Sequence, residues 1–205
     1  DLMDAEGPDV VWDIPNGKVL KTNTVGKNIL NYDSMLVLAH FKGHPMGGYG
    51  GALKQLSIGC ASSKGKALIH SGGVSTDIID CWNKHAEQDR FCEAMADAAS
   101  SVVEHFGKNI LFINVMKNLS VDCDCTAQAE DPCMEDIGIL ASLDPVALDG
   151  AADLLADGKA DLERLRLHIQ HDHLMRAAGR AAAIDVFELR VLFQAVCSLQ
   201  NVSPR

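Results

Sequence analysis

The sequence predicts an α/β protein in which helices flank a layered sheet. Two continuous apolar runs of strand length, residues 34–39 and 109–116, are typical of buried strands. Between them, residues 87–106 carry apolar side chains at spacings of three and four, which predicts an amphipathic helix. A helix followed by a buried strand, with an earlier buried strand upstream, indicates a sheet with some parallel pairing.

The segments between and after these runs are patterned less clearly. Residues 57–70 mix small side chains with lysines and have no clear period, so we interpret them as an irregular segment. Helical character begins at residues 77–82. A third apolar strand is expected at residues 137–141, and a helix follows for which Asp144 is suited as the N-cap and Pro145 as the first residue.

Both ends of the chain are also patterned. Residues 10–12 and 19–20 flank a Pro-Asn-Gly turn signal and predict a hairpin. Residues 162–199 have a helical pattern with a break at a glycine. We therefore divide the chain into an α/β domain, residues 1–156, which holds the glycine-rich loop and the DCDC loop described below, and a helical C-terminal extension of the same domain, residues 157–205.

Composition limits the class of protein. The 205 residues are 47% hydrophobic, which is enough for one substantial core. The net charge of −10 argues against nucleic acid or an anionic membrane as a partner, because such surfaces need clustered Lys and Arg. No uncharged apolar run approaches the roughly 20 residues of a membrane span. Seven scattered cysteines do not form a secreted disulfide framework, so we expect a reducing, cytoplasmic compartment.

The stretch at residues 39–59 is the most distinctive part of the chain. It follows the first buried strand and places His40, Lys42 and His44 among several glycines. Glycine lets a backbone approach another group closely, so we expect a loop wrapped around a ligand. The helix that begins at residue 52 is expected to aim its free N–H groups at an anion. The alternative is a tight surface turn in which the two histidines are merely hydrogen-bonded.

A second cluster is the sequence Asp-Cys-Asp-Cys at residues 122–125, in the long loop after the second buried strand. Adjacent carboxylates raise the pKa of a thiol, so these cysteines are expected to be poor free nucleophiles, whereas a bound cation would hold them deprotonated. Imidazole and thiolate together suit zinc or iron, and His40 or His44 would complete the shell if the two strand ends are neighbours. The alternative is that both cysteines are solvent-facing loop residues.

The other cysteines and the common catalytic motifs indicate little chemistry. The sequence contains no P-loop, no G-x-S-x-G and no H-E-x-x-H. The C-x-C spacing matches neither the paired motifs of zinc sites nor the cysteine run of ferredoxins. Four further cysteines lie in apolar or helical contexts and are expected to behave as small buried hydrophobes: Cys60, Cys81, Cys92 and Cys197.

Three motifs, HFKGHPMGGYGGALKQLSIGCASSKGK, NVMKNLSVDCDC and DIGILASLDPVALD, resemble in this order the uncharacterised iron–sulfur-centre proteins, a domain of unknown function found in bacteria and archaea. The resemblance covers about residues 1–155. Because the DLMDAEG opening looks like an internal segment of that family, it implies a member that is truncated at the N-terminus. Family members often carry a ferredoxin insertion between the segment near His70 and the helix near Trp82. Residues 71–81 bridge that gap directly here, and the ferredoxin-type cluster motif is absent.

The resemblance implies a metal ion or an iron–sulfur cluster as cofactor. The implied metal ligands are Cys123, Cys125, His40, His44, Asp122 and Asp124. The implied groups that hold an anionic cofactor or ligand are Gly47, Gly48, Gly50 and Gly51. The residue pattern adds Lys42, which with Lys54 is expected to form a local cationic pocket. Catalytic roles are expected for His44 and Lys54. The glycine loop is also similar to the H-x-F-x-G-Y-x-G-G-x-K pattern of the nickel-pincer lactate racemase family, a similarity that implies a Rossmann-like frame and a small anionic ligand.

We therefore expect a protein that binds a metal or iron–sulfur centre and has a redox or metal-assisted role. One alternative is an enzyme that acts on a small phosphorylated or carboxylated metabolite bound in the glycine-rich loop. In that enzyme Lys42 and Lys54 would hold the substrate, and His44 would transfer a proton. A further alternative is a non-catalytic interaction subunit whose site has decayed.

Overall fold

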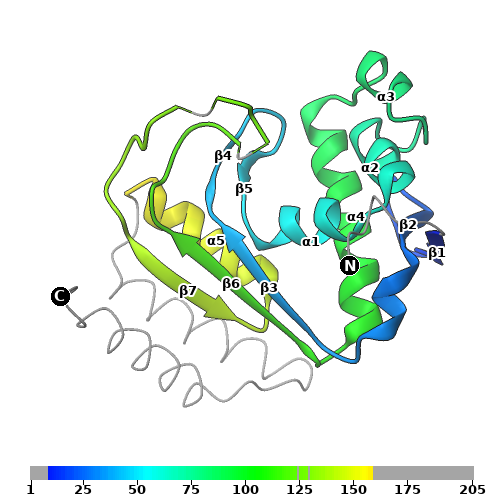
Figure 1. The fold of residues 1–205 in the computed structure, drawn as a ribbon, viewed down its shortest axis with the longest axis horizontal. Helices are drawn as coiled ribbons and strands as arrows, with labels where there is room; N and C mark the ends of the chain where they lie inside the picture. The colour runs from blue at the N-terminus through cyan, green and yellow to red at the C-terminus, as the bar shows by residue number, and fades with distance from the viewer. Residues whose placement is uncertain (1–8, 124, 129, 159–205) are drawn as a thin grey trace.

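The computed structural model describes residues 9–123, 125–128 and 130–158 (Figure 1). The predicted helices at residues 162–199 and Cys197 lie outside these residues, as does Asp124. The proposed extension at residues 157–205 therefore stays a prediction. Within the described ranges, no helix has the length and apolar character needed to cross a bilayer.

The central sheet has three strands in the order β3-β6-β7. Their bounds are Met35–His40 for β3, Ile110–Met116 for β6 and Gly138–Ser142 for β7. β3 and β6 run parallel, with Met35 opposite Ile110 and His40 opposite Val115, so the predicted parallel pairing is confirmed. β7 lies where the third apolar strand is expected, and it runs antiparallel to β6. The α/β fold is thus confirmed.

Three helices cover one face of this sheet: α1 (Ala52–Cys60), α4 (Gln88–Phe106) and α5 (Pro145–Ala156). Val37 of β3 and Phe112 of β6 pack against apolar side chains from all three helices, and burial of each such side chain contributes about 1.5–3 kcal/mol. Alternate residues of β3 point the other way, and Leu36 and Leu38 are 58% and 59% exposed. The core therefore lies between the sheet and one helical layer.

The two helix predictions in this layer are confirmed. In α4, four residues at successive spacings of seven, four and four positions are buried: Phe91, Ala98, Val102 and Phe106. Asp144 caps α5 as expected, because its carboxylate accepts from the backbone N–H groups of Val146 and Ala147, and Pro145 is the first helical residue.

The N-terminal hairpin forms with a different second strand from the one predicted. β1 (Asp9–Asp13) pairs antiparallel with β2 (Thr22–Gly26), and the 3-10 helix η1 (Lys27–Asn31) follows. The amide groups of residues 19–20 instead donate to the carboxylate of Asp97 in α4, at 2.6 and 2.8 Å. These donors are consequently not available to a strand ladder.

The expectation of an irregular segment at residues 57–70 is wrong. α1 extends to Cys60, and a second helix, α2 (Ser63–His70), begins after Ser62, whose hydroxyl accepts from the N–H of Gly65. Gly65 lies against β2 so closely that an added Cβ would be 2.0 Å from the carbonyl oxygen of Thr24. A glycine in the middle of a short helix hides the helical pattern, yet close packing requires it here.

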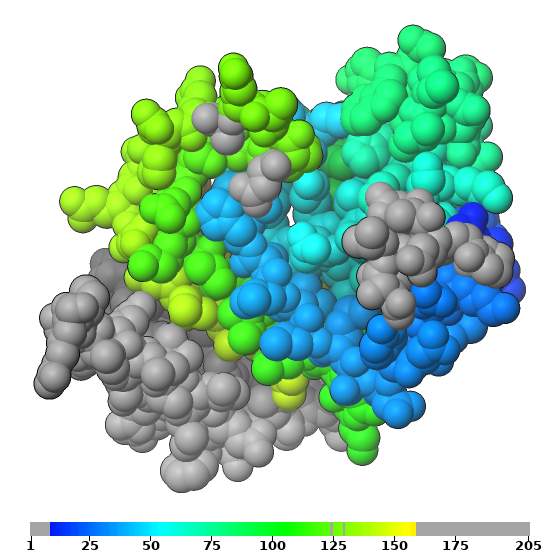
Figure 2. Space-filling model, viewed as in Figure 1, coloured from blue at the N-terminus to red at the C-terminus, as the bar shows by residue number. Residues whose placement is uncertain are grey.

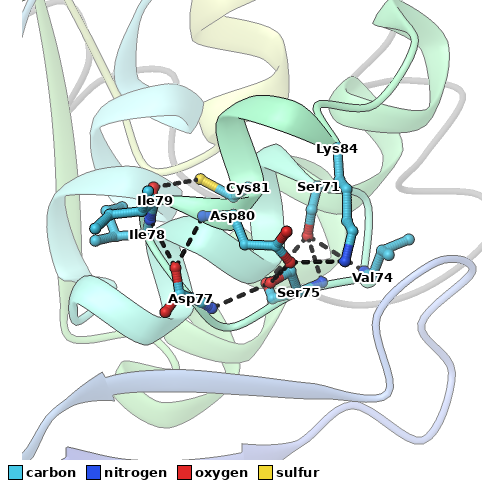
Figure 3. A network of polar contacts seen from close by, with 9 residues as sticks. All are labelled: Ser71, Val74, Ser75, Asp77, Ile78, Ile79, Asp80, Cys81 and Lys84. Carbon is cyan, nitrogen blue, oxygen red and sulfur yellow. Dashed lines mark hydrogen bonds and ion pairs between the residues drawn. The ribbon is translucent and has the colours of Figure 1, made fainter.

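The short connection from α2 to α4 is held by its own polar groups (Figure 3). Asp77 Oδ1 accepts from the N–H groups of Ile79 and Asp80, at 2.9 and 2.8 Å, just before the short helix α3 (Asp80–Asn83). The Asp80 carboxylate then accepts from Ser75 Oγ at 2.9 Å and from Lys84 Nζ at 2.8 Å. The predicted helical character near residues 77–82 is confirmed.

We predict that Gly65→Ala lowers the free energy of unfolding by about 1–3 kcal/mol, because the new methyl group has no space beside Thr24 O. The matched control is Gly150→Ala in α5, where an added Cβ meets nothing within 4 Å and replacement of a helical glycine is expected to stabilise by about 0.5–1 kcal/mol. Urea denaturation of the two variants checks this. Equal stability of the two would contradict the packing of α2 on β2.

Candidate functional site

The parallel pairing of β3 and β6 brings two loops to the same edge of the sheet (Figure 1). The first is a hairpin of β4 (Lys42–His44) and β5 (Gly48–Gly50), which we call the glycine hairpin, and the second is the cysteine loop, residues 117–137. The N–H of Gly43 donates to Ser120 O at 2.8 Å, and a Cβ on Gly43 would lie 2.1 Å from Val121 O. The two segments border each other in Figure 2. The expectation that the two strand ends are neighbours is confirmed.

The two thiols of the cysteine loop are in contact. Cys125 Sγ donates to Cys123 Sγ at 2.8 Å, and the N–H of Cys125 lies 3.5 Å from the same sulfur. Lys54, in the first turns of α1, donates from Nζ to Cys123 Sγ at 3.4 Å. Cys123 is 2% exposed, whereas Cys125 is an exposed residue. The alternative that both cysteines face solvent is therefore wrong for Cys123.

The two thiols differ in acidity. Burial by itself raises the pKa of Cys123, but the hydrogen bonds from Cys125 and the ammonium group of Lys54 outweigh burial, so the pKa lies below its ordinary value. The pKa of Cys125 is raised, first because its S–H donates to Cys123 and then because of burial and the negative charge on Cys123. Cys123 is therefore the more acidic thiol of the pair.

This asymmetry corrects the expectation that neighbouring aspartates make both cysteines poor nucleophiles. The carboxylate of Asp122 accepts from the N–H of Glu130 at 3.0 Å, and a lysine contacts the sulfur of Cys123 instead. Lys54 lies 69 positions upstream of Cys123, so the local sequence around the cysteines does not reveal it.

His44 is held in one tautomer within the glycine hairpin. Its Nδ1 accepts from the N–H groups of Met46 and Gly47 at 3.2 and 2.9 Å, so the ring proton is on Nε2. Burial, followed by the positive charges of Lys54, His70 and Lys42, lowers the pKa of His44 to about 4. The alternative in which the histidines are merely hydrogen-bonded in a surface turn is thus half correct for His44. The hydrogen bonds are present, but the residue is only 8% exposed and does not lie in a surface turn.

The structure does not gather the predicted metal ligands into one cluster. His40 Nε2 donates to Lys117 O at 2.8 Å, and Nδ1 of His44 is bonded to amides as described above. Across the described ranges, no three His, Cys, Asp or Glu side chains are placed so that they could hold a metal ion. Cys123 and Cys125 are together, and ligation by His40, His44 or Asp122 stays a prediction.

The N-terminus of α1 already holds an anion, which is the carboxylate of Asp149 from α5. It accepts from Ala52 N at 2.8 Å and Leu53 N at 2.9 Å, and from Asn114 Nδ2 of β6 at 2.7 Å. Burial raises the pKa of this carboxyl group, and its three hydrogen bonds oppose that effect. The expectation that these N–H groups await an external anion is therefore wrong.

Sequence reasoning missed Asp149 and Asn114, although a signal was present. Asn114 lies in the middle of the apolar run at residues 109–116, and Asp149 is a charged residue in a largely apolar helix. Both side chains are fully buried. A polar residue at a core position needs a buried partner, and here the amide N–H of Asn114 donates to the carboxylate of Asp149.

The glycines and lysines predicted to bind a ligand also shape the hairpin. A Cβ on Gly50 would lie 3.3 Å from Lys42 Cε and 3.3 Å from Lys54 Cδ, so this glycine lets both lysine side chains pass. Gly48 has a φ of +77°, which favours glycine in the hairpin turn. A Cβ on Gly51 would lie 2.6 Å from Asp149 Oδ1. Ligand binding by Gly47, Gly48, Gly50, Gly51 and Lys42 and catalysis by His44 and Lys54 stay predictions.

The remaining cysteines behave as packing groups where the structure describes them. Cys60 and Cys81 are buried, and burial raises the pKa of Cys60 to about 11. Cys92 is half-buried, and its pKa is raised by burial and by the charge of Asp89. The expectation of buried hydrophobic cysteines is therefore confirmed for Cys60 and Cys81.

Comparison with known proteins identifies one related family. A family model described as a domain of unknown function (DUF362) matches residues 1–152. No curated protein and no solved structure matches the chain. The matched region includes both cysteines of the cysteine loop, the glycine hairpin and Asp149, so the whole candidate site lies inside it.

We predict that Asp149→Ala lowers the free energy of unfolding by at least about 3 kcal/mol, because it leaves two amides and the Asn114 side chain without their acceptor. The control is Asp153→Ala, one turn later in α5 and half-buried, which is expected to cost no more than about 1 kcal/mol. Chemical denaturation measures both changes. A small loss for Asp149→Ala would show that the carboxylate does not tie α5 to α1.

A pH dependence follows from His44. Its pKa is lowered from 6.5 to about 4 in the folded chain, so the unfolded chain binds the proton more tightly and stability falls as the pH drops from 6.5 towards 4. The loss amounts to at most about 3 kcal/mol. His44→Asn, whose amide oxygen can accept from the same backbone groups, should weaken the pH dependence in this window. Denaturation curves at several pH values would contradict this assignment if both proteins lost the same stability.

Proposed function

The chain belongs to the DUF362 family of unknown function, and we propose that it binds a thiophilic metal ion through Cys123 and Cys125, in a redox or metal-assisted role. The observation that carries this proposal is the 2.8 Å contact between the two sulfurs, which offers two soft donors at one point. Thiolate ligands favour copper(I), zinc and iron over hard cations. The pKa of Cys123 lies below that of an ordinary thiol, which favours the deprotonated form that binds a metal.

The donor set fits a single ion and does not fit a conventional iron–sulfur cluster. Such clusters are held by four cysteine thiolates, or by two cysteines and two histidines. The third cysteine of the loop, Cys133, turns its sulfur towards Leu119 O at 3.3 Å, and no group of three candidate ligands exists in the part of the chain that the structure describes. An ion held by Cys123 and Cys125 would keep positions for ligands from solution.

Lys54 affects this proposed site directly. Its ammonium group and a metal cation would compete for Cys123 Sγ, which lies 3.4 Å from Nζ. The long flexible side chain of lysine can withdraw when an ion binds. Lys54 therefore stabilises negative charge on this sulfur before an ion binds, at some cost to metal affinity.

A reducing cytoplasmic location belongs to the same proposal, because a thiol pair must stay reduced in order to bind a metal. The alternative of an enzyme for small anionic metabolites has less support. Several donors that would hold the anion have internal partners: the first amides of α1 bind Asp149, and those of Met46 and Gly47 bind His44.

The proposal is tested with the full chain purified without oxygen and titrated with zinc or cadmium ions, following the thiolate-to-metal absorption band. The wild type is expected to bind one ion. Cys123→Ser and Cys125→Ser should each weaken affinity at least tenfold, or by about 1.4 kcal/mol, whereas Cys133→Ser should leave it unchanged. Lys54→Met should strengthen affinity relative to Lys84→Met, a lysine that pairs with Asp80 elsewhere.

Two outcomes would defeat the proposal. The first is wild-type protein that takes up neither iron, zinc, nickel nor cadmium while its thiols are shown to be reduced. The second is uptake that survives in both serine variants of the pair, which would place the ion elsewhere in the molecule.

A further inference from the structure

We propose that Cys123 and Cys125 also form a reversible intramolecular disulfide by exchange with a small-molecule disulfide. The geometry that suggests this is the sulfur contact itself, since Sγ of Cys125 lies 2.8 Å from Sγ of Cys123 within one loop. A second thiol in contact with the first converts a mixed disulfide into an internal one without any movement of separate domains. Cys133 has no such arrangement, because its sulfur contacts a carbonyl oxygen.

The different exposure of the two cysteines sets the order of events. Cys125 is exposed and can meet a disulfide from solution, whereas Cys123 is 2% exposed and cannot. Access therefore makes Cys125 the attacking residue, although its pKa is the higher of the two, and Cys123 is the buried residue that resolves the mixed disulfide. The N–H of Cys125, 3.5 Å from Cys123 Sγ, holds the resolving sulfur beside its target.

The exchange balances with a symmetric disulfide RSSR as the oxidant. Sγ of Cys125 attacks one sulfur of RSSR, the S–S bond breaks, and one RSH leaves with the proton of Cys125. Sγ of Cys123 then attacks Sγ of Cys125, and the second RSH leaves with the proton of Cys123. The two cysteines lose two electrons in total, and RSSR is reduced to two thiols.

Lys54 opposes this oxidation. Its Nζ donates to Cys123 Sγ at 3.4 Å, an interaction that stabilises negative charge on the sulfur and that a neutral disulfide cannot match. Oxidation would release the ammonium group beside Gly50, where the side chain of Lys42 also passes. The redox state of the cysteine loop would thereby change the charge available at the glycine hairpin.

The disulfide itself does not depend on metal binding. Its consequence for metal does rest on the proposed function: a disulfide has no thiolate ligands, so oxidation would release the ion. The pair would then bind metal only under reducing conditions, and a small-molecule disulfide would act as the signal.

The test incubates the full chain, with a chelator present and no metal, in mixtures of reduced and oxidised glutathione. Proteolysis and mass spectrometry then measure the state of the 123–125 peptide. The wild type should lose two hydrogens in this peptide and carry no glutathione. Cys123→Ser should retain one glutathione on Cys125, because the resolving sulfur is missing. Cys125→Ser should show little modification at the buried Cys123, and Cys133→Ser should oxidise like the wild type.

Lys54→Met tests whether the ammonium group affects the equilibrium between dithiol and disulfide, which a purely structural role of Lys54 would leave unchanged. It should increase the ratio of disulfide to dithiol at a fixed glutathione mixture at least severalfold, whereas Lys84→Met should not change it. Two results would overturn the proposal: stable glutathione adducts on wild-type Cys125, or a fully reduced pair under conditions that modify the exposed Cys133. Because this test contains no metal, a failure to form the disulfide is distinct from a failure of the pair to bind a metal ion.

Discussion

The parallel pairing of β3 with β6 is the constraint on which the candidate site depends. Parallel strands place their carboxyl ends at the same edge of a sheet, so the glycine hairpin after β3 and the cysteine loop after β6 must be neighbours. Gly43 then allows the two backbones to touch, with its N–H bonded to Ser120 O. Without this pairing, Lys54 and Cys123 would have no reason to meet.

Asp149 extends the same constraint into the helical layer. One buried carboxylate joins the first turn of α1, the middle of β6 and α5. α1 carries Lys54, and β6 leads into the cysteine loop, so this one residue sets the position of both partners of the Lys54–Cys123 contact. Burial disfavours the charged form of Asp149, and three hydrogen bonds offset part of this cost. The carboxylate that binds the helix N-terminus is thus structural and contributes to the site only by placing its parts.

Much of the fold could be predicted because it follows from local patterns. The buried strands, the amphipathic stripe of α4 and the Asp144 cap of α5 are each encoded within a few neighbouring residues. α2 could not be predicted from its local sequence. Gly65 disfavours a helix locally, and it is required only because the backbone packs closely against the carbonyl oxygen of Thr24, far away in the sequence. The candidate site could also be predicted only in part. The meeting of the two loops followed from the strand order, whereas the Lys54 contact, which adds to the effect of Cys125 in lowering the pKa of Cys123, joins residues far apart in the sequence.

Cys123 and Cys125 are proposed to act as one chemical unit at this edge of the sheet. X-ray absorption spectroscopy at the zinc edge of the zinc-loaded full chain tests it most directly. We expect two sulfur neighbours per zinc at about 2.3 Å, with lighter atoms in the remaining positions. Four sulfur neighbours, or none, would contradict it.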